Sequence, residues 1–113
     1  MITVRLDILG IGAVQLELKK GVYANGRLAI MLEEAETKEP WCVLTVNMPD
    51  DNLEDGEFFV KTWSENADTS TALMSQTDLF ENTGRIVPAG YANACVWKFK
   101  DKETLERIES HGR

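Results

Sequence analysis

The chain has 113 residues, of which 43% are hydrophobic and 27% charged, and its formal net charge is −7. This composition is typical of one globular domain and argues against a disordered or fibrous chain. No apolar stretch approaches the roughly 20 residues of a membrane span, and the first residues lack a signal-peptide pattern. We therefore expect one cytoplasmic domain over residues 1–113, with a β-rich core at 1–100 and a C-terminal helix and tail at 101–113.

The first two predicted strands alternate apolar and polar side chains. This alternation runs through residues 2–8 and returns in residues 14–19. A period of two is typical of a strand with one buried face. Gly10 and Gly12 lie between the two runs, so residues 9–12 are expected to form a tight hairpin connection.

The dipeptide Asn25-Gly26 is the strongest local signal in the chain. It readily supplies the two positive φ angles of a type I′ turn, and it precedes an alternating third strand at residues 28–32. An acidic stretch follows at residues 33–39. Residues 41–48 are then dense in apolar and β-branched side chains, which predicts a fourth strand.

The second half of the chain mixes strands and helices. Residues 57–63 predict a fifth strand, residues 85–87 a short edge strand and residues 91–99 a last strand. Residues 69–76 predict a short helix with Ser, Thr and Asp upstream as caps.

A second helix is expected at the C-terminal end, where Asp101 can cap it and Gly112 can end it. Leu105 and Ile108 would lie on its buried face. The whole pattern predicts an α+β fold with a strongly curved or barrel-like antiparallel sheet of six or seven strands, one short internal helix and one C-terminal helix.

The residues that carry most enzyme chemistry are scarce. His111 is the only histidine, and it lies in a terminal segment expected to fray. Cys42 and Cys95 lie in apolar runs and are expected to be reduced and buried, a disulfide being the alternative if their strands are neighbours. We expect no catalytic residue, metal site or cofactor, and carboxylate-only chemistry with a bound metal is the one enzymatic alternative left open.

The acidic loop at residues 50–57 raises the question of calcium binding. An EF-hand register that starts at Asp51 puts Gly56 correctly sixth, but it places Leu53 at the third ligand position. Thr62 stands where the bidentate glutamate belongs. The pattern favours a solvated loop.

Negative charge is concentrated in residues 31–57, which hold nine acidic residues and one lysine. If the two acidic loops of this segment lie at the same end of the sheet, they form one patch that attracts a basic partner and repels nucleic acid. The alternative is that the acids only solvate two loops. The candidate partner-binding residues of this acidic face are Glu33, Glu34, Glu36, Asp50, Asp51, Glu54, Asp55 and Glu57.

A second group combines aromatic, basic and polar side chains that often dominate binding. One interpretation makes it an exposed recognition surface. The favoured interpretation is structural, because Ser64 and Asn66 can bond nearby backbone groups after the fifth strand. The group consists of Trp63, Glu65, Asn66, Arg85 and Tyr91.

Five segments carry a resemblance to a known family, namely residues 23–30, 44–50, 59–66, 83–85 and 90–91. In this order they resemble the bacterial and phage family catalogued as domain of unknown function 4313. The resemblance covers roughly residues 20–99 and implies a small protein encoded by a mobile genetic element, without transferring an activity or a catalytic residue.

The leading functional hypothesis is a non-enzymatic protein that binds a basic host protein. Its target would handle nucleic acid in host defence, as a CRISPR effector does, and neither nucleic acid nor a membrane would be bound directly. The alternative is a self-assembling accessory module of plasmids or phages, such as a homodimer formed through an exposed sheet edge.

Overall fold

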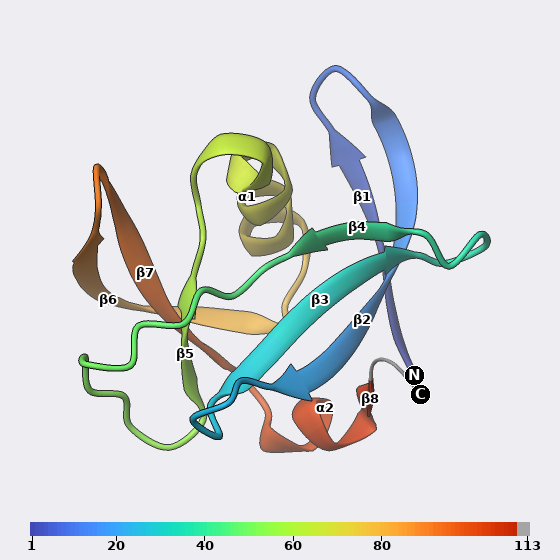
Figure 1. The fold of residues 1–113 in the computed structure, drawn as a ribbon. Coiled ribbons are helices and arrows are strands. Elements are labelled where there is room, and N and C mark those ends of the chain that lie inside the picture. The colour runs from blue at the N-terminus through green and yellow to red at the C-terminus, as the bar shows by residue number, and fades with distance from the viewer. Residues whose placement is uncertain (111–113) are drawn as a thin grey trace.

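The computed structural model describes residues 1–110 and shows an α+β fold with two sheets (Figure 1). The first sheet has the antiparallel order β1-β2-β3-β4, and β8 pairs parallel with β2; the second has the antiparallel order β5-β7-β6. The strands are β1 (Ile2–Ile8), β2 (Gly12–Val22), β3 (Leu28–Glu34), β4 (Pro40–Val43), β5 (Glu57–Val60), β6 (Phe80–Ala89), β7 (Ala92–Phe99) and β8 (Glu109–Ser110). The helices are a 3₁₀ turn, η1 (Ser64–Asn66), then α1 (Ala67–Gln76) and α2 (Lys102–Arg107).

The predicted first hairpin is confirmed. β1 alternates strictly between buried and exposed residues, and Ile2 pairs with Leu18 while Leu6 pairs with Val14. Because side chains alternate across a strand, this register puts one apolar row of β1 on the core.

The turn between β2 and β3 differs from the predicted type I′ turn. Only Gly26 of the dipeptide has a positive φ, 85°. The Gly26 amide donates to the Tyr23 carbonyl at 2.8 Å, and the Tyr23 amide donates to the Arg27 carbonyl at 2.8 Å. This is a three-residue loop with its glycine at the left-handed position, a common hairpin alternative.

The predicted fourth strand is too long, because β4 ends at Val43 and the chain then crosses between the sheets. The Leu44 amide donates to Ile30 of β3 at 2.9 Å, and the Val46 amide donates to Phe59 of β5 at 3.0 Å. Thr45 forms an isolated bridge with Val60. Residues 44–46 therefore connect the two sheets. Their β-branched, apolar composition is compatible with this crossing and with a regular strand.

β6 is much longer than the edge strand predicted at residues 85–87. Its pairing with β7 shifts between Asn82 and Ile86, where Gly84 has a φ of 87°. The Thr83 hydroxyl donates to the Val96 carbonyl at 2.8 Å within this irregular part. Thr83 and Gly84 thus lie in a bulge inside one strand.

The sheets of the described chain do not close into a barrel. Helix α1 packs against β1 and β6, the free edges of the two sheets, and fills the gap between them (Figure 1). The Asp7 amide donates to Gln76 Oε1 at 2.8 Å, and Gln76 Nε2 donates to the Asp7 carbonyl at 2.9 Å. Because this side-chain amide takes the place of a neighbouring strand, the barrel-like expectation is wrong.

Both predicted helices are present, with corrections at their ends. α1 covers the predicted residues 69–76, but Asn66 is its N-cap and no side chain caps it. Asp101 caps α2 as predicted, accepting a hydrogen bond from the Glu103 amide at 2.9 Å. This helix ends at Arg107, and Gly112 lies outside the described residues. No helix of residues 1–110 is long and apolar enough to cross a membrane.

Two apolar clusters stabilise the fold. The main core lies between the sheets and α1, and its aromatic part brings Phe80 to within 4.9 Å of Phe99 and 5.4 Å of Trp97 between ring centroids. A second core is formed by Phe59, Ala94 and Val96. Because these three alternate with main-core residues along β5 and β7, they lie on the other face of the second sheet. The side chains that cover them are Val46, Met48, Leu53, Trp63, Val87 and Ala89.

Candidate functional site

The two acidic loops lie at opposite ends of β3. The loop that joins β3 to β4 follows the Glu34 end, whereas residues 48–57 lie near the hairpin that precedes the Leu28 end (Figure 1). A seven-residue strand separates these points by roughly 20 Å. The expectation of a single acidic face is therefore not met, and each loop has to be considered alone.

Arg27 holds residues 48–57 at their first turn. Its guanidinium donates to the Met48 carbonyl at 2.7 Å and to the Asp51 carbonyl at 2.5 Å. The same guanidinium lies 5.9 Å from the centre of the Phe59 ring in the second core. Arg27 thus binds backbone carbonyls of the acidic loop and does not pair with the Asp51 carboxylate.

Arg85, from the irregular part of β6, holds the other end of the loop. Its guanidinium donates to Glu57 Oε2 at 2.9 Å and to the Asn52 carbonyl at 3.4 Å. Between the two arginines, Leu53 packs into the second core. The loop is therefore fixed at both ends and in its middle.

Four carboxylates of this loop make no contact with these two arginines. They form no ion pair within residues 1–110, and only Glu57 of the loop's acids is paired. Three of the four residues are exposed and Asp51 is half-buried. Residues 48–57 thus carry four acidic side chains that no ion pair within residues 1–110 neutralises, namely Asp50, Asp51, Glu54 and Asp55.

The acidic hairpin at the other end of β3 is built around a buried carboxylate. Glu17 of β2 is 1% exposed, and Lys38 of the hairpin donates to its Oε1 at 2.8 Å. Lys19 Nζ lies 3.1 Å from Oε2, an ion pair without the geometry of a hydrogen bond. Burial raises the pKa of Glu17, but the two ammonium groups outweigh it and hold that pKa below its ordinary value.

Sequence analysis missed the role of Glu17. It occupies the polar row of β2, where an exposed side chain is expected, and the hairpin over it cannot be seen in the sequence. Lys38 adopts a positive φ of 65°, which is uncommon for a residue with a side chain. Lys38, the only basic residue in positions 31–57 of the sequence, thus helps to neutralise the Glu17 carboxylate, which belongs to β2.

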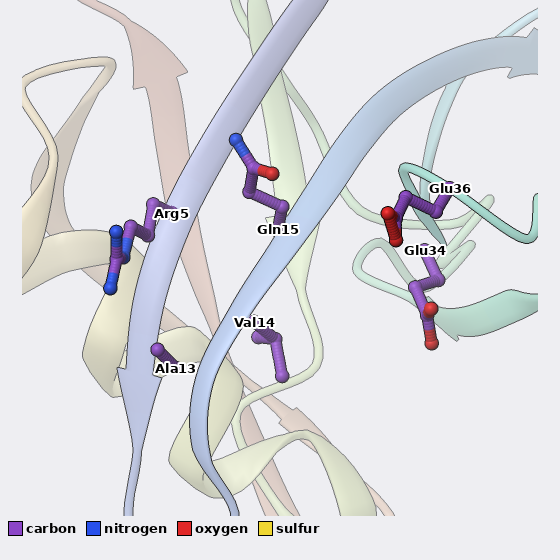
Figure 2. A pocket seen from close by; sticks show the side chains of 6 residues that line it. All are labelled: Arg5, Ala13, Val14, Gln15, Glu34 and Glu36. Atoms are coloured by element: carbon purple, nitrogen blue, oxygen red, sulfur yellow. The ribbon is translucent and has the colours of Figure 1, made fainter.

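A pocket of about 490 Å³ lies beside this hairpin (Figure 2). Figure 2 shows the Glu34 and Glu36 side chains close together, while the Arg5 side chain points away from them on the other side of β1. The charged groups do not converge on one point, so the pocket offers no binding chemistry of its own. Its lining residues are Arg5, Ala13, Val14, Gln15, Glu34 and Glu36.

The second predicted group divides into structural and exposed members. Asn66 is fully buried and its Nδ2 donates to the Val43 carbonyl at 2.7 Å, a bond to a distant segment rather than to the nearby backbone that was predicted. Trp63 packs on the second core, and Glu65 pairs with Lys61 at 2.7 Å. Arg85 anchors the acidic loop. Tyr91 alone projects freely, at the tip of the β6–β7 hairpin.

The cysteines and possible metal ligands form no further candidate site within the described residues. Cys42 and Cys95 are free and half-buried, and burial raises the pKa of the Cys42 thiol to about 11. Within residues 1–110, no group of three or more His, Cys, Asp or Glu side chains could hold a metal ion. His111 lies outside the described residues.

Comparisons of the chain with family models, curated proteins and solved structures found no match. The resemblance to domain of unknown function 4313 therefore stays a prediction.

Proposed function

We propose that the protein is a non-enzymatic binding protein whose loop at residues 48–57 engages a basic protein. In the setting that the family resemblance implies, this partner is a cytoplasmic host defence protein that handles nucleic acid, such as a CRISPR effector, and binding inhibits it. A surface that binds nucleic acid in a cell's defence is rich in Lys and Arg, so a fixed acidic loop is complementary to it.

The observation that carries the proposal is the way the loop is anchored. Arg27 and Arg85 bind backbone carbonyls at Met48, Asp51 and Asn52, so the loop is ordered without neutralising most of its carboxylates. A preorganised loop loses little conformational entropy on binding. Unpaired charges on such a loop also attract an opposite charge from a distance and raise the association rate.

The same reasoning gives less support to the hairpin between β3 and β4. Its Lys38 adds a positive charge to that loop, although the charge is partly balanced by Glu17. Direct binding of nucleic acid is disfavoured at both loops, because phosphate affinity comes mainly from Lys and Arg.

Self-assembly through a sheet edge, the alternative function, has less support from the geometry. Gln76 covers part of the β1 edge, and β6 carries a bulge and Pro88. Bulges and prolines are common ways in which natural sheets prevent pairing of their edges. Light scattering over a concentration series tests this alternative, which predicts a stable dimer.

The experiment that tests the proposal neutralises the loop and compares it with a matched variant. The loop variant carries Asp50→Asn, Asp51→Asn, Glu54→Gln and Asp55→Asn. The control removes the same number of charges elsewhere, through Glu34→Gln, Glu36→Gln, Glu81→Gln and Glu106→Gln. Both should keep the fold, which circular dichroism checks.

Wild-type protein is first used as bait in a nuclease-treated lysate of cells that carry the gene, at low and high salt. We expect one basic protein that is lost at high salt. Its association rate should fall by at least about tenfold with the loop variant and much less with the control. Equal rates for the two variants would contradict the proposal.

A further inference from the structure

The hairpin formed by β6 and β7 contacts the acidic loop. Val87 and Ala89 of this hairpin pack on the second core, which Leu53 of the loop also covers. Arg85 of β6 adds the ion pair with Glu57 at 2.9 Å. Apolar packing and a charged contact thus join the base of the hairpin to the loop, and both lie on the left in Figure 1. The hairpin tip lies at the other end of β7 from Glu57, which pairs with Lys98, so a partner that touches both must span the length of this strand.

Tyr91 is the one large side chain of this hairpin that has no structural task. It is 113% exposed, and no hydrogen bond or ring contact joins it to the rest of residues 1–110. Gly90, with a φ of 67°, supplies the positive φ of the two-residue turn that the Ala89–Ala92 pair closes. An aromatic ring is not needed for such a turn, and its exposure to water is unfavourable.

The surroundings of Tyr91 select the kind of group that its ring can bind. Residues 86–96, around the hairpin tip, contain no Lys, Arg, Asp or Glu, and Arg85 farther along β6 is paired with Glu57, so no cation near the tip competes for the ring face. The negative face of a phenol ring attracts a guanidinium or an ammonium group within about 6 Å. A basic partner drawn to the acidic loop would bring such groups to this side of the molecule.

We infer that Tyr91 is an anchor residue for the basic partner, and that its ring stacks on an Arg or Lys side chain of that partner. This inference rests on the proposed function. It extends the binding surface from the acidic loop to the tip of the β6–β7 hairpin, and it assigns the two parts different tasks. The loop accelerates association, whereas a short-range ring contact slows dissociation.

The test compares Tyr91→Phe, which keeps the ring, with Tyr91→Leu, which keeps an apolar side chain but removes the π face. The control variant carries Leu9→Ser and Ile11→Ser, which remove the exposed apolar side chains of the β1–β2 hairpin tip instead. All are measured against the protein that the wild-type bait captures from the nuclease-treated lysate. We expect dissociation about threefold faster for Tyr91→Leu, and wild-type rates for Tyr91→Phe and for the control.

The possible results separate this inference from the proposed function. If Tyr91→Leu dissociates like wild type while neutralising the loop slows association, the inference is wrong and the proposed function stands. If Tyr91→Leu dissociates faster but neutralising the loop changes nothing, the acidic loop is not the site. Equal losses for Tyr91→Leu and Tyr91→Phe would overturn the ring contact, and an empty bait would overturn both claims.

Discussion

The two acidic loops at the ends of β3 are both rich in acidic residues, but they are attached to the rest of the fold in different ways. The hairpin after β3 is attached to the sheet by a side-chain ion pair, Lys38 with the buried Glu17, so part of its charge is used inside the fold. Residues 48–57 are attached through carbonyls that accept from Arg27 and Arg85. The comparison teaches that an acidic loop can be held either by its own lysine or by arginines of other segments, and that neither way uses most of its carboxylates.

The largest expected effect comes from removing the cation of the hairpin. Lys38→Met leaves Glu17 with Lys19 as its only close cation, and breaking a buried ion pair from one side is costly. Lys38 is 56% exposed and Lys19 remains, so the loss in the free energy of unfolding should lie below that for a fully buried pair; we expect about 2–3 kcal/mol, measured in urea. A change below about 0.5 kcal/mol would show that the pair is as weak as an exposed one.

Arg27→Ala should have the next largest effect, and its effect should be local. The variant loses two charge-assisted hydrogen bonds and a contact with Phe59, which we expect to cost about 2 kcal/mol. Amide hydrogen exchange should become faster in residues 48–57 and stay unchanged in the hairpin after β3. Faster exchange in both loops would contradict the separation of the two anchors.

Acid should act on the hairpin through Glu17. The pKa of Glu17 is lowered by folding from its ordinary value of 4.5, so its contribution to stability is present above that value and is lost as the pH falls through the folded pKa. Urea unfolding below the ordinary pKa should therefore show a steeper loss for wild type than for Glu17→Gln. Parallel curves would exclude this carboxylate as a source of acid sensitivity.

Arg85→Ala should have the smallest effect on stability. Its side chain is 45% exposed, which screens its ion pair although the Glu57 side chain is only 6% exposed, so we expect a loss of about 1 kcal/mol. Exchange should nevertheless become faster near Asn52, because the variant also frees that carbonyl. A loss of more than about 2 kcal/mol would mean that Arg85 supports the second core as well.

Local signals in the sequence predicted the first hairpin and the cap of α2, because alternation and capping depend on neighbours along the chain. The crossing at residues 44–46 could not be predicted, since one apolar segment pairs first with β3 and then with β5. The missing barrel closure has a similar cause. The pairing of Gln76 with Asp7 joins residues far apart in the sequence, and a glutamine in a helix gives no sign of it.

The sequence predicted which acidic residues belong to the candidate site, but it did not predict how the fold holds them. The acids of residues 50–55 were identified because charge is visible in the sequence. Their anchors were not, because Arg27 binds carbonyl groups, which every residue possesses. Asn66 shows the reverse case, in which a polar residue considered for recognition is buried beneath Val43.

The most direct test of the central claim is the association rate of Arg27→Ala with the captured basic protein at low salt. This substitution keeps every carboxylate and makes the chain more acidic, so bulk charge alone predicts faster association. The present account predicts slower association, because the loop that presents the carboxylates is no longer held at Met48 and Asp51. Association as fast as or faster than that of wild type would contradict the claim that anchoring of the loop, rather than net charge, creates the binding site.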